Sequence, residues 1–218
     1  MKKFALIGYP VSHSISPLLH RSIFYQLKLD HFYELKELKK EDLESFVSRN
    51  RYFGYNVTIP YKKTIFNYIN KFENSCEDIG STNCIFKGKG YNTDWKGFVL
   101  SLKKNNIDVS QKKCAIIGAG ATAKSIAYAL IELRCKSISI YNRTHENRIS
   151  LENWIRFKIK TYNTKNYDII INSTSLGMWP NILESPMIKF ITSKDQIFYD
   201  VIYNPIKTKF LKEAQEIG

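Results

Sequence analysis

The stretch Cys114-Ala115-Ile116-Ile117-Gly118-Ala119-Gly120-Ala121-Thr122-Ala123-Lys124 decides the fold of the second half of the chain. It indicates a buried strand, a tight glycine turn and the start of a helix, and a second apolar strand follows at 137–141. In this pattern Gly118 permits the turn, Gly120 lets a pyrophosphate approach the backbone, and Ala123 lets the helix pack against the strand. A bare GxGxxA pattern has little specificity. Placed between two strands and opening a helix, it predicts a Rossmann-type dinucleotide-binding domain.

The residues at the end of the second strand, Asn142-Arg143-Thr144, indicate which dinucleotide binds. An Asp or Glu there would accept hydrogen bonds from the adenosine ribose of NAD. A guanidinium instead binds phosphate in a planar, bidentate manner, so this segment suits the 2′-phosphate of NADP. Two further strands, at 167–172 and 196–201, end where dinucleotides bind in open α/β sheets. The predicted cofactor-binding residues are Gly118, Ala119, Gly120, Ala121, Thr122, Asn142, Arg143, Thr144, Thr174 and Val201.

The first half of the chain alternates predicted strands and helices, which implies a mainly parallel sheet covered by helices. The strands are predicted at 4–8, 32–35 and 54–59, and the helices from Pro17, at 41–49 and at 61–72. A short turn is predicted near 75–79, and a hairpin around Lys87-Gly88-Lys89. The predicted fold class is therefore α/β. We expect a substrate domain at 1–94, a connecting helix and linker at 95–112, and a Rossmann-like NADP domain at 113–218, with a cleft between the two domains.

A second stretch, Asn56-Val57-Thr58-Ile59-Pro60-Tyr61-Lys62, carries residue types suited to catalysis. Pro60 is favourable at the first position of a helix, which places Lys62 in the first turn. A helix N-terminus disfavours a cation, so this ammonium is predicted to release a proton more readily than an ordinary one. The alternative is that the lysine simply points into solvent. Asn56 and Thr58 share one strand face beside it, which is typical of a small polar substrate site.

Four more polar residues have both a local structural and a functional interpretation. Ser14 and Ser16 lie before a helix in a loop rich in Ser, Gly and Pro, where hydroxyls commonly act as caps. Asn83 and Asp94 both project from the predicted hairpin unit, and an Asp before Trp95-Lys96-Gly97 can also cap a helix. His13 and His20 are interpreted as surface or helix-packing residues.

Composition limits the classes of partner. The formal charge of +13 favours anionic ligands, but lysines and arginines are spread along the chain and aromatic residues lie in apolar segments, which argues against nucleic-acid binding. No apolar run approaches the roughly 20 residues that span a bilayer, and no signal peptide precedes the first strand. The four cysteines have no metal-binding spacing, which predicts reduced thiols, a cytoplasmic protein and no metal site.

Taken together, these motifs resemble the shikimate dehydrogenase family, from Lys3 to Gly218. Single motifs are common, but all of them in this order are highly specific. The matching stretches are Ser14-x-Ser16-Pro17, Asn56-Val57-Thr58-x-Pro60-x-Lys62, Thr82-Asn83, Asn92-Thr93-Asp94-x-x-Gly97, Gly118-Ala119-Gly120, Asn142-Arg143-Thr144, Asn172-x-Thr174-x-x-Gly177-Met178 and Asp200-x-x-Tyr203-x-Pro205.

The resemblance implies reversible reduction of 3-dehydroshikimate to shikimate by NADPH, in the biosynthesis of chorismate and aromatic amino acids. It makes Lys62 and Asp94 the catalytic pair and residues 118–122 the pyrophosphate cradle. The expected assembly is a monomer or a homodimer. The residues implied to bind the small-molecule substrate are Ser14, Ser16, Thr58, Asn83 and Tyr203, and Asn56 is predicted to join them.

The chain departs from the family pattern in three places. Ala121-Thr122 stands where the family often has Gly-Ala, and the segment between Thr144 and Tyr167 lacks a clear strand. The family's usual C-terminal part, which brings a glycine to the nicotinamide and a glutamine to the substrate, is absent from these 218 residues. We therefore expect these residues alone to have weak activity or none.

Three alternatives remain open at this point. The first is a relative that uses quinate, or NAD, for breakdown; Arg143 without a neighbouring acid argues against NAD but does not distinguish quinate from shikimate. The second is a non-catalytic sensor on the same scaffold, which would have no need of both Lys62 and Asp94. The third is a nucleic-acid binder, whose DNA binding would depend steeply on salt.

Overall fold

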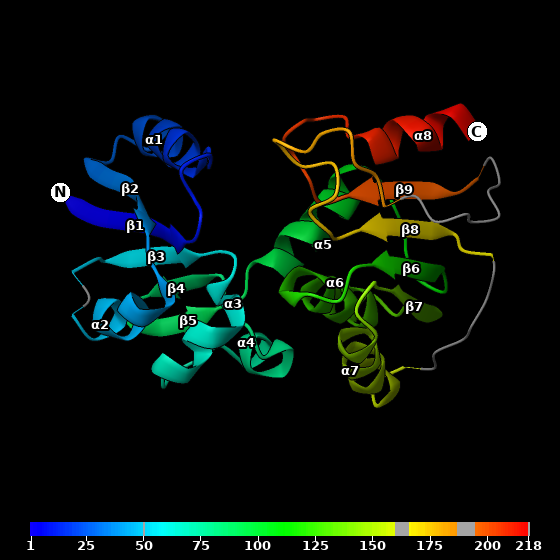
Figure 1. Cartoon of the computed structure of the whole chain (residues 1–218), viewed down its shortest axis with the longest axis horizontal. Helices are drawn as coiled ribbons and strands as arrows, with labels where there is room; N and C mark the ends of the chain where they lie inside the picture. Colours follow the sequence, from blue (N-terminus) through cyan, green and yellow to red (C-terminus); the bar gives the residue numbers. More distant parts are fainter. Residues whose placement is uncertain (50, 160–165, 187–194, 218) are drawn as a thin grey trace. The chain divides into compact units, whose positions relative to one another are not determined.

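The computed structural model describes residues 1–49, 51–159, 166–186 and 195–217. The chain divides into two compact units, Met1–Asp94 and Trp95–Gly218. Figure 1 shows a sheet with flanking helices in each of them.

The described part of the first unit contains a five-stranded sheet in the order β2-β1-β3-β4-β5. The first three strands are parallel and the last two form an antiparallel hairpin, as the sequence predicts. The strands are β1 (Lys2–Gly8), β2 (His31–Glu37), β3 (Gly54–Val57), β4 (Cys84–Phe86) and β5 (Lys89–Tyr91). The helices are α1 (Ser16–Gln26), the 3-10 helix η1 (Lys40–Asp42), α2 (Leu43–Ser48), α3 (Tyr61–Thr64), the 3-10 helix η2 (Ile65–Tyr68) and α4 (Asn74–Ile79).

The helix predicted at 61–72 is wrong in its length. One turn of α-helix, α3, passes into the 3-10 helix η2, and the backbone is extended at Ile69. The segment is rich in β-branched and aromatic residues, which lose rotamer freedom in a helix. Ile65 and Ile69 are both buried in the core of the first unit, so packing determines the path of the chain here.

Smaller boundary predictions also need correction. The strand predicted to reach Ile59 ends at Val57, and Pro60 directly precedes α3 rather than occupying its first position. The segment predicted as a turn near 75–79 is the helix α4, whose buried face includes Cys76 and Ile79. Left-handed Gly80 ends this helix, as expected for a C-terminal cap.

The described part of the second unit contains a four-stranded parallel sheet in the order β7-β6-β8-β9. This βαβ arrangement confirms the Rossmann-type prediction. The strands are β6 (Lys113–Ile117), β7 (Ser137–Tyr141), β8 (Ile169–Asn172) and β9 (Ile197–Asp200), and the helices are α5 (Asp94–Lys104), α6 (Ala121–Glu132), α7 (His145–Arg156) and α8 (Lys209–Ile217). The sequence predicts no clear strand between Thr144 and Tyr167. This segment begins with α7, and its residues 160–165 lie outside the described part.

The period-two pattern of the strands explains the two layers of helices in the second unit. In β6, Cys114 and Ile116 face a cluster that includes side chains of α5, α6 and α7. Ala115 and Ile117 face the opposite side, where they pack with Phe210 of α8. Both faces of the sheet are therefore covered, as is typical of parallel sheets.

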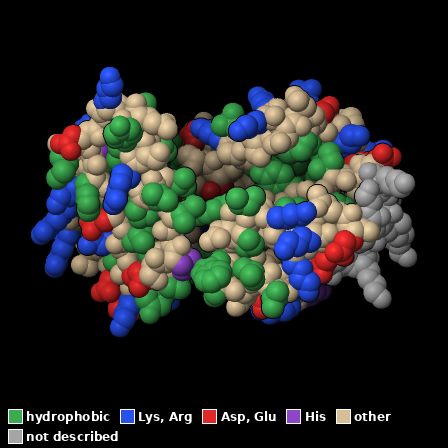
Figure 2. Space-filling model, turned by 90° about the horizontal axis from the view of Figure 1, so that it is seen from above, with side chains coloured by type: hydrophobic (Ala, Val, Ile, Leu, Met, Phe, Trp, Pro, Cys, Tyr) green, Lys and Arg blue, Asp and Glu red, His purple; other side chains and the backbone are tan. Residues whose placement is uncertain are grey.

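No helix in the described ranges is both long and apolar enough to span a bilayer. All four cysteines are free thiols. The described residues contain no cluster of three or more His, Cys, Asp or Glu able to hold a metal ion. Figure 2 shows Lys and Arg side chains in several separate groups over the visible face, with acidic side chains among them.

Candidate active site

Lys62 and Asp94 form a partly buried ion pair in the first unit. The Lys62 Nζ lies 2.6 Å from Asp94 Oδ2, and the two side chains are only 14% and 23% exposed. Such a partly buried pair is a charge-assisted hydrogen bond and is less screened by water than a surface pair. The sequence placed both residues in one site, and the structure brings them together from positions 32 residues apart.

Short contacts from neighbouring segments hold both members of the pair. The Thr82 N–H donates to the Lys62 carbonyl at 2.9 Å, which ties α3 to the chain entering β4. The Asp94 N–H donates to Asn92 Oδ1 at 3.2 Å. Asn92 is fully buried, and its amide also donates to the Ser81 carbonyl at 3.0 Å. A buried amide therefore determines where α5 begins.

Asn83 completes the environment of the Asp94 carboxylate. Its Nδ2 donates to Asp94 Oδ1 at 2.6 Å and to Thr93 Oγ1 at 2.9 Å. Its Oδ1 accepts a hydrogen bond from the Thr93 N–H at 2.8 Å. Each oxygen of Asp94 thus has its own donor, Lys62 on one side and Asn83 on the other. This explains why Asp94 is more than a helix cap, although it is the first residue of α5.

The helix-dipole argument for Lys62 loses its basis in the structure. Helix α3 has only four residues, so Lys62 belongs to its first and its last turn at once. A single turn has no extended row of aligned peptide dipoles. The chemistry of Lys62 therefore depends on its burial and on Asp94, neither of which can be read from residues 56–62 alone.

Ser14 and Ser16 lie together at the start of α1, as their spacing predicts. Ser14 Oγ donates to Ser16 Oγ at 3.1 Å and accepts the Ser16 N–H at 3.2 Å. Ser14 therefore has the cap-like contact proposed as its structural role. Both hydroxyls are also partly exposed, which leaves them accessible to a ligand.

Asn56 belongs to a small polar cluster that includes two residues not predicted as part of the site. The Tyr33 hydroxyl donates to Asn56 Oδ1 at 2.8 Å, and the ring of His20 stacks on Tyr33 with centroids 4.0 Å apart. Burial raises the pKa of Tyr33 and lowers the pKa of His20, so both rings are neutral at pH 7. His20 is a helix-packing residue, as predicted. Tyr33 could have been found from the sequence because it lies in a predicted strand, and the hydroxyl of a buried tyrosine requires a hydrogen-bond partner.

Thr58 and Tyr203 complete the predicted substrate residues. Thr58 directly follows β3, and its N–H donates to the Ile7 carbonyl at 2.9 Å, which holds it beside the end of β1. Tyr203 belongs to the second unit, where it follows β9 and is 61% exposed.

The predicted cofactor residues lie at the carboxyl edge of the second sheet. Gly118 follows β6 with a φ of +114° and donates its N–H to the Tyr141 carbonyl at 2.7 Å. A Cβ at Gly118 would lie 2.5 Å from Ser173 Oγ and 3.3 Å from Thr174 Cγ2. The Gly118 N–H thus joins the ends of β6 and β7, and the Ser173 N–H, which donates to the Ile117 carbonyl at 2.8 Å, joins β8 to them. This edge is where α/β sheets bind dinucleotides.

Gly120 and the start of α6 have the properties of a pyrophosphate cradle. Gly120 precedes the first residue of α6, and nothing lies within 4 Å of the position that its Cβ would take. The first N–H groups of a helix have no partner within it and carry partial positive charge. The donors and the free space therefore fit a bound phosphate. Ala119 is buried below the turn, and Ala121 and Thr122 form the first turn of α6.

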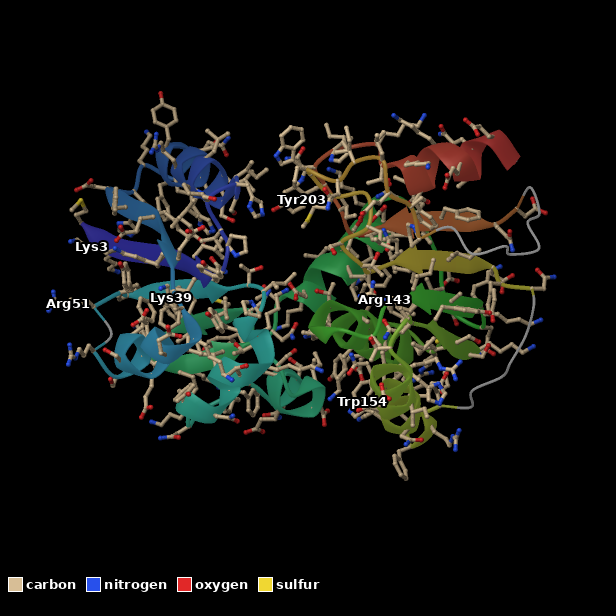
Figure 3. All side chains as sticks on the ribbon, viewed as in Figure 1. Lys3, Lys39, Arg51, Arg143, Trp154 and Tyr203 are labelled. Atoms are coloured by element: carbon tan, nitrogen blue, oxygen red, sulfur yellow. The ribbon has the colours of Figure 1, made fainter. Side chains whose placement is uncertain are left out.

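A side-chain hydrogen bond from Asn142 holds the backbone of the segment between β7 and α7. Asn142 Nδ2 donates to the Thr144 carbonyl at 2.8 Å, and Thr144 is the residue before α7. Arg143 between them is exposed. Arg143 follows the carboxyl end of β7, and Figure 3 shows Tyr203 on the side of the second sheet to which its strand arrows point. The structure thus leaves the guanidinium free to meet an anion at this edge.

The other two cofactor candidates follow β8 and β9. Thr174 donates both its N–H and its hydroxyl to Asn172 Oδ1, at 2.9 and 2.7 Å. The Val201 N–H donates to the Asn172 carbonyl at 3.1 Å. The fully buried Asn172 therefore organises the edge of the sheet, a role that the sequence analysis did not assign to it.

Replacing Gly118 by alanine is expected to lower the free energy of unfolding by about 1–3 kcal/mol, because the new Cβ imposes a strained positive φ and meets Ser173. Urea denaturation of both proteins measures this difference. Gly97→Ala is the matched control, since a Cβ there meets nothing within 4 Å and Gly97 lies inside α5. Equal stability of Gly118→Ala and the parent chain would contradict the steric argument.

The fold and the two sites define an α/β protein of the dinucleotide-dependent oxidoreductase class. Residues 6–85 match the family model for the shikimate dehydrogenase substrate binding domain, and residues 100–205 match that for shikimate / quinate 5-dehydrogenase. The chain belongs to the shikimate dehydrogenase family. This confirms the predicted resemblance and the predicted fold class.

Individual relatives agree with this assignment. The chain is 38% identical over 234 residues to shikimate dehydrogenase (NADP(+)) of Caldanaerobacter subterraneus subsp. tengcongensis, covering 100% of this chain and 84% of the relative. A crystal structure of a shikimate dehydrogenase in complex with NADP+ has a TM-score of 0.91 at 33% identity, covering 100% of this chain and 82% of that one. The enzyme of Thermus thermophilus, solved with NADP(H) and shikimate, has a TM-score of 0.89 at 27% identity, with coverage of 100% and 85%.

Proposed function

We propose that the protein is an NADP-dependent shikimate dehydrogenase, which reversibly reduces 3-dehydroshikimate to shikimate in the biosynthesis of chorismate and aromatic amino acids. The Lys62–Asp94 ion pair carries this proposal, because it supplies a proton-exchanging group inside a family of NADP(+) oxidoreductases. The curated relatives that support it are named for the same reaction and cofactor.

Oxidation of the secondary alcohol of shikimate releases a hydride and a proton, and reduction takes both back. The bound nicotinamide supplies or accepts the hydride. The proton moves between the substrate oxygen and the pair formed by Lys62 Nζ and Asp94 Oδ2, which are 2.6 Å apart. We assign the transferred proton to the pair rather than to either side chain alone. Asn83 holds the second Asp94 oxygen and keeps the carboxylate oriented.

The substrate's polar groups match the polar side chains of the first unit. We assign the carboxylate of shikimate to the hydroxyls of Ser14 and Ser16, which lie 3.1 Å apart and can both donate to an anion. Asn56, Thr58 and Asn83 would contact the ring hydroxyls. Tyr203 is proposed as a further substrate contact from the second unit.

The second unit would hold NADP at the carboxyl edge of its sheet, through glycine residues and through amide and hydroxyl groups. Gly118, Ala119, Gly120, Ala121 and Thr122 would surround the pyrophosphate at the start of α6. The other contacts proposed for the cofactor are Asn142, Arg143 and Thr144 at the 2′-phosphate, and Thr174 and Val201 towards the nicotinamide half.

Replacing Arg143 by alanine is expected to weaken NADP binding by about 10- to 100-fold, which is the change in affinity expected when hydrogen bonds to a charged group are lost. NAD, which lacks the 2′-phosphate, should bind as before. Calorimetric titration with each nucleotide measures the two affinities. Arg156→Ala is the matched control, because Arg156 is also exposed but lies at the other end of α7. An equal loss for NADP and NAD would show that Arg143 does not read the 2′-phosphate.

The activity itself is tested by following the absorbance of the reduced nicotinamide. Shikimate or quinate is supplied with NADP or NAD in parallel, and shikimate binding is measured separately by calorimetry. Turnover of shikimate with NADP supports the proposal, and a preference for quinate or NAD supports the breakdown enzyme. Because these 218 residues alone are expected to have weak activity or none, the assay is also run on the chain extended by the C-terminal part of a family member. Tight shikimate binding without any turnover by the extended form would favour a sensor.

We also propose a cytoplasmic location and a monomer or homodimer. The four free thiols support a reducing compartment. Sedimentation equilibrium measures the oligomeric state, and a species larger than a dimer would contradict this part of the proposal.

A further inference from the structure

Glu37, at the end of β2, forms a clamp on the loop that joins β1 to α1. Its Oε1 accepts hydrogen bonds from the N–H groups of Val11 at 2.8 Å and Ser12 at 2.9 Å. These two amide donors lower the pKa of Glu37, so its side chain is a carboxylate at neutral pH. One carboxylate oxygen that accepts two consecutive backbone N–H groups orders both peptide units.

The register of the sheet explains why Glu37 reaches this loop. Strands β1 and β2 are parallel neighbours (Figure 1). In their register Glu37 lies opposite Gly8, the last residue before the loop. The Leu38 N–H donates to the Gly8 carbonyl at 3.1 Å, which continues the pairing one step further. The backbone of Glu37 is therefore held by the sheet, and only its side chain extends to the loop.

The clamp is connected directly to the paired serines. The Ser14 N–H donates to the carbonyl of Val11, at 2.9 Å, and Val11 is also the residue whose N–H the clamp holds. Ser14 Oγ in turn contacts both the hydroxyl and the N–H of Ser16. The Val11 side chain is 1% exposed and anchors the same loop in the core. A continuous series of contacts thus leads from Glu37 to the two hydroxyls.

We propose that Glu37 is a positioning residue that preorganises the loop carrying Ser14 and Ser16, and so sets the affinity for the substrate's carboxylate without touching it. This inference rests on the proposed function, which assigns that carboxylate to the two serines. A loop that is already ordered loses less conformational freedom when it binds. Removing the clamp therefore weakens substrate binding and leaves the proton-transferring pair intact.

The test compares Glu37→Ala with Glu37→Gln, because the glutamine oxygen can still accept both N–H groups. Calorimetry measures shikimate and NADP affinity, steady-state assays measure KM and kcat, and NMR measures hydrogen exchange of the Val11 and Ser12 amides. We expect Glu37→Ala to raise the Kd and KM for shikimate about tenfold, with kcat and NADP affinity unchanged. The two amides should exchange faster, and Glu37→Gln should recover most of both effects. Glu44→Ala removes another exposed acid of the same unit and is the control.

Each outcome separates this proposal from the proposed function. Unchanged shikimate affinity in Glu37→Ala, with faster exchange of both amides, would show that the clamp only stabilises the loop and would overturn the inference. An equal loss in Glu37→Gln and Glu37→Ala would also overturn it, since the hydrogen-bond geometry would then be irrelevant. A parent chain that binds NADP but not shikimate would overturn the proposed function, and this inference with it.

Discussion

Lys62→Met is expected to lower kcat for shikimate oxidation by about 10²- to 10⁴-fold, the range that general acid–base groups contribute. Methionine keeps an unbranched apolar chain in the space of the lysine stem but has no proton to exchange. Because NADP is assigned to the second unit, its affinity should not change. The effect is measured as kcat, and single-turnover absorbance extends the range if steady-state rates are low.

The neighbouring lysine is a matched control for this variant. Lys63 lies in the same helical turn but is exposed, so Lys63→Met should retain the parent rate. A fall below twofold in kcat for Lys62→Met would remove this residue from the proton-transfer step. An equal fall in both variants would indicate a structural effect on α3 rather than loss of a catalytic group.

Asp94→Asn is expected to lower kcat by about 10²-fold, the lower end of the same range. The carboxylate receives one donor on each oxygen, Lys62 at 2.6 Å and Asn83 at 2.6 Å. The amide of asparagine has only one acceptor oxygen, so its NH₂ group must face one of these two donors. The charge that holds the Lys62 ammonium is lost at the same time. A kcat–pH profile and KM values for both variants measure the consequence.

Asp30→Asn, at a carboxylate that is 88% exposed, is the control for this change. The double variant Lys62→Met/Asp94→Asn gives a second check. Residues that act as one unit have strongly non-additive effects, so the double variant should be about as slow as Lys62→Met alone. Losses that multiply would show that the two side chains act in separate steps.

The sequence was most informative for the second unit, and the reason is physical. A parallel strand buried on both faces is continuously apolar, and the glycine turn and the helix that follow need particular residues at fixed spacing. The prediction of a strand at 137–141 therefore coincides with β7. In the first unit, the paired strands and the hairpin were also predictable from local patterns, but the length of α3 was not. Burial of Ile65 and Ile69 determines that length, and burial depends on contacts distant in sequence.

The candidate site was predicted as a set of residues but not as a network. The resemblance to the family, rather than the spacing of the residues alone, pointed to Lys62, Asp94 and Asn83 as members of one site. It did not reveal that Asn83 and Lys62 hold opposite oxygens of Asp94, since that requires the positions of three separate segments. Tyr33 and Glu37 were not predicted for the same reason. Their contacts follow from the register of β2 against β1, which a sequence pattern does not determine.

The saturated hydrogen bonding of Asn83 limits the ligands that can bind beside it. Both hydrogens of its amide nitrogen are used, one on Thr93 and one on Asp94, and its oxygen accepts the N–H of Thr93 at 2.8 Å and the hydroxyl of Thr93 at 3.2 Å. A ligand hydroxyl that contacts Asn83, as we propose for the substrate, must therefore replace the Thr93 hydroxyl at the amide oxygen and bring a hydrogen of its own. Analogues of shikimate in which this hydroxyl becomes an amino group should still bind, whereas fluorine or a methyl ether at that position should weaken binding. The proposed contact would thus depend on the direction of the hydrogen bond, which offers a starting point for the design of selective inhibitors.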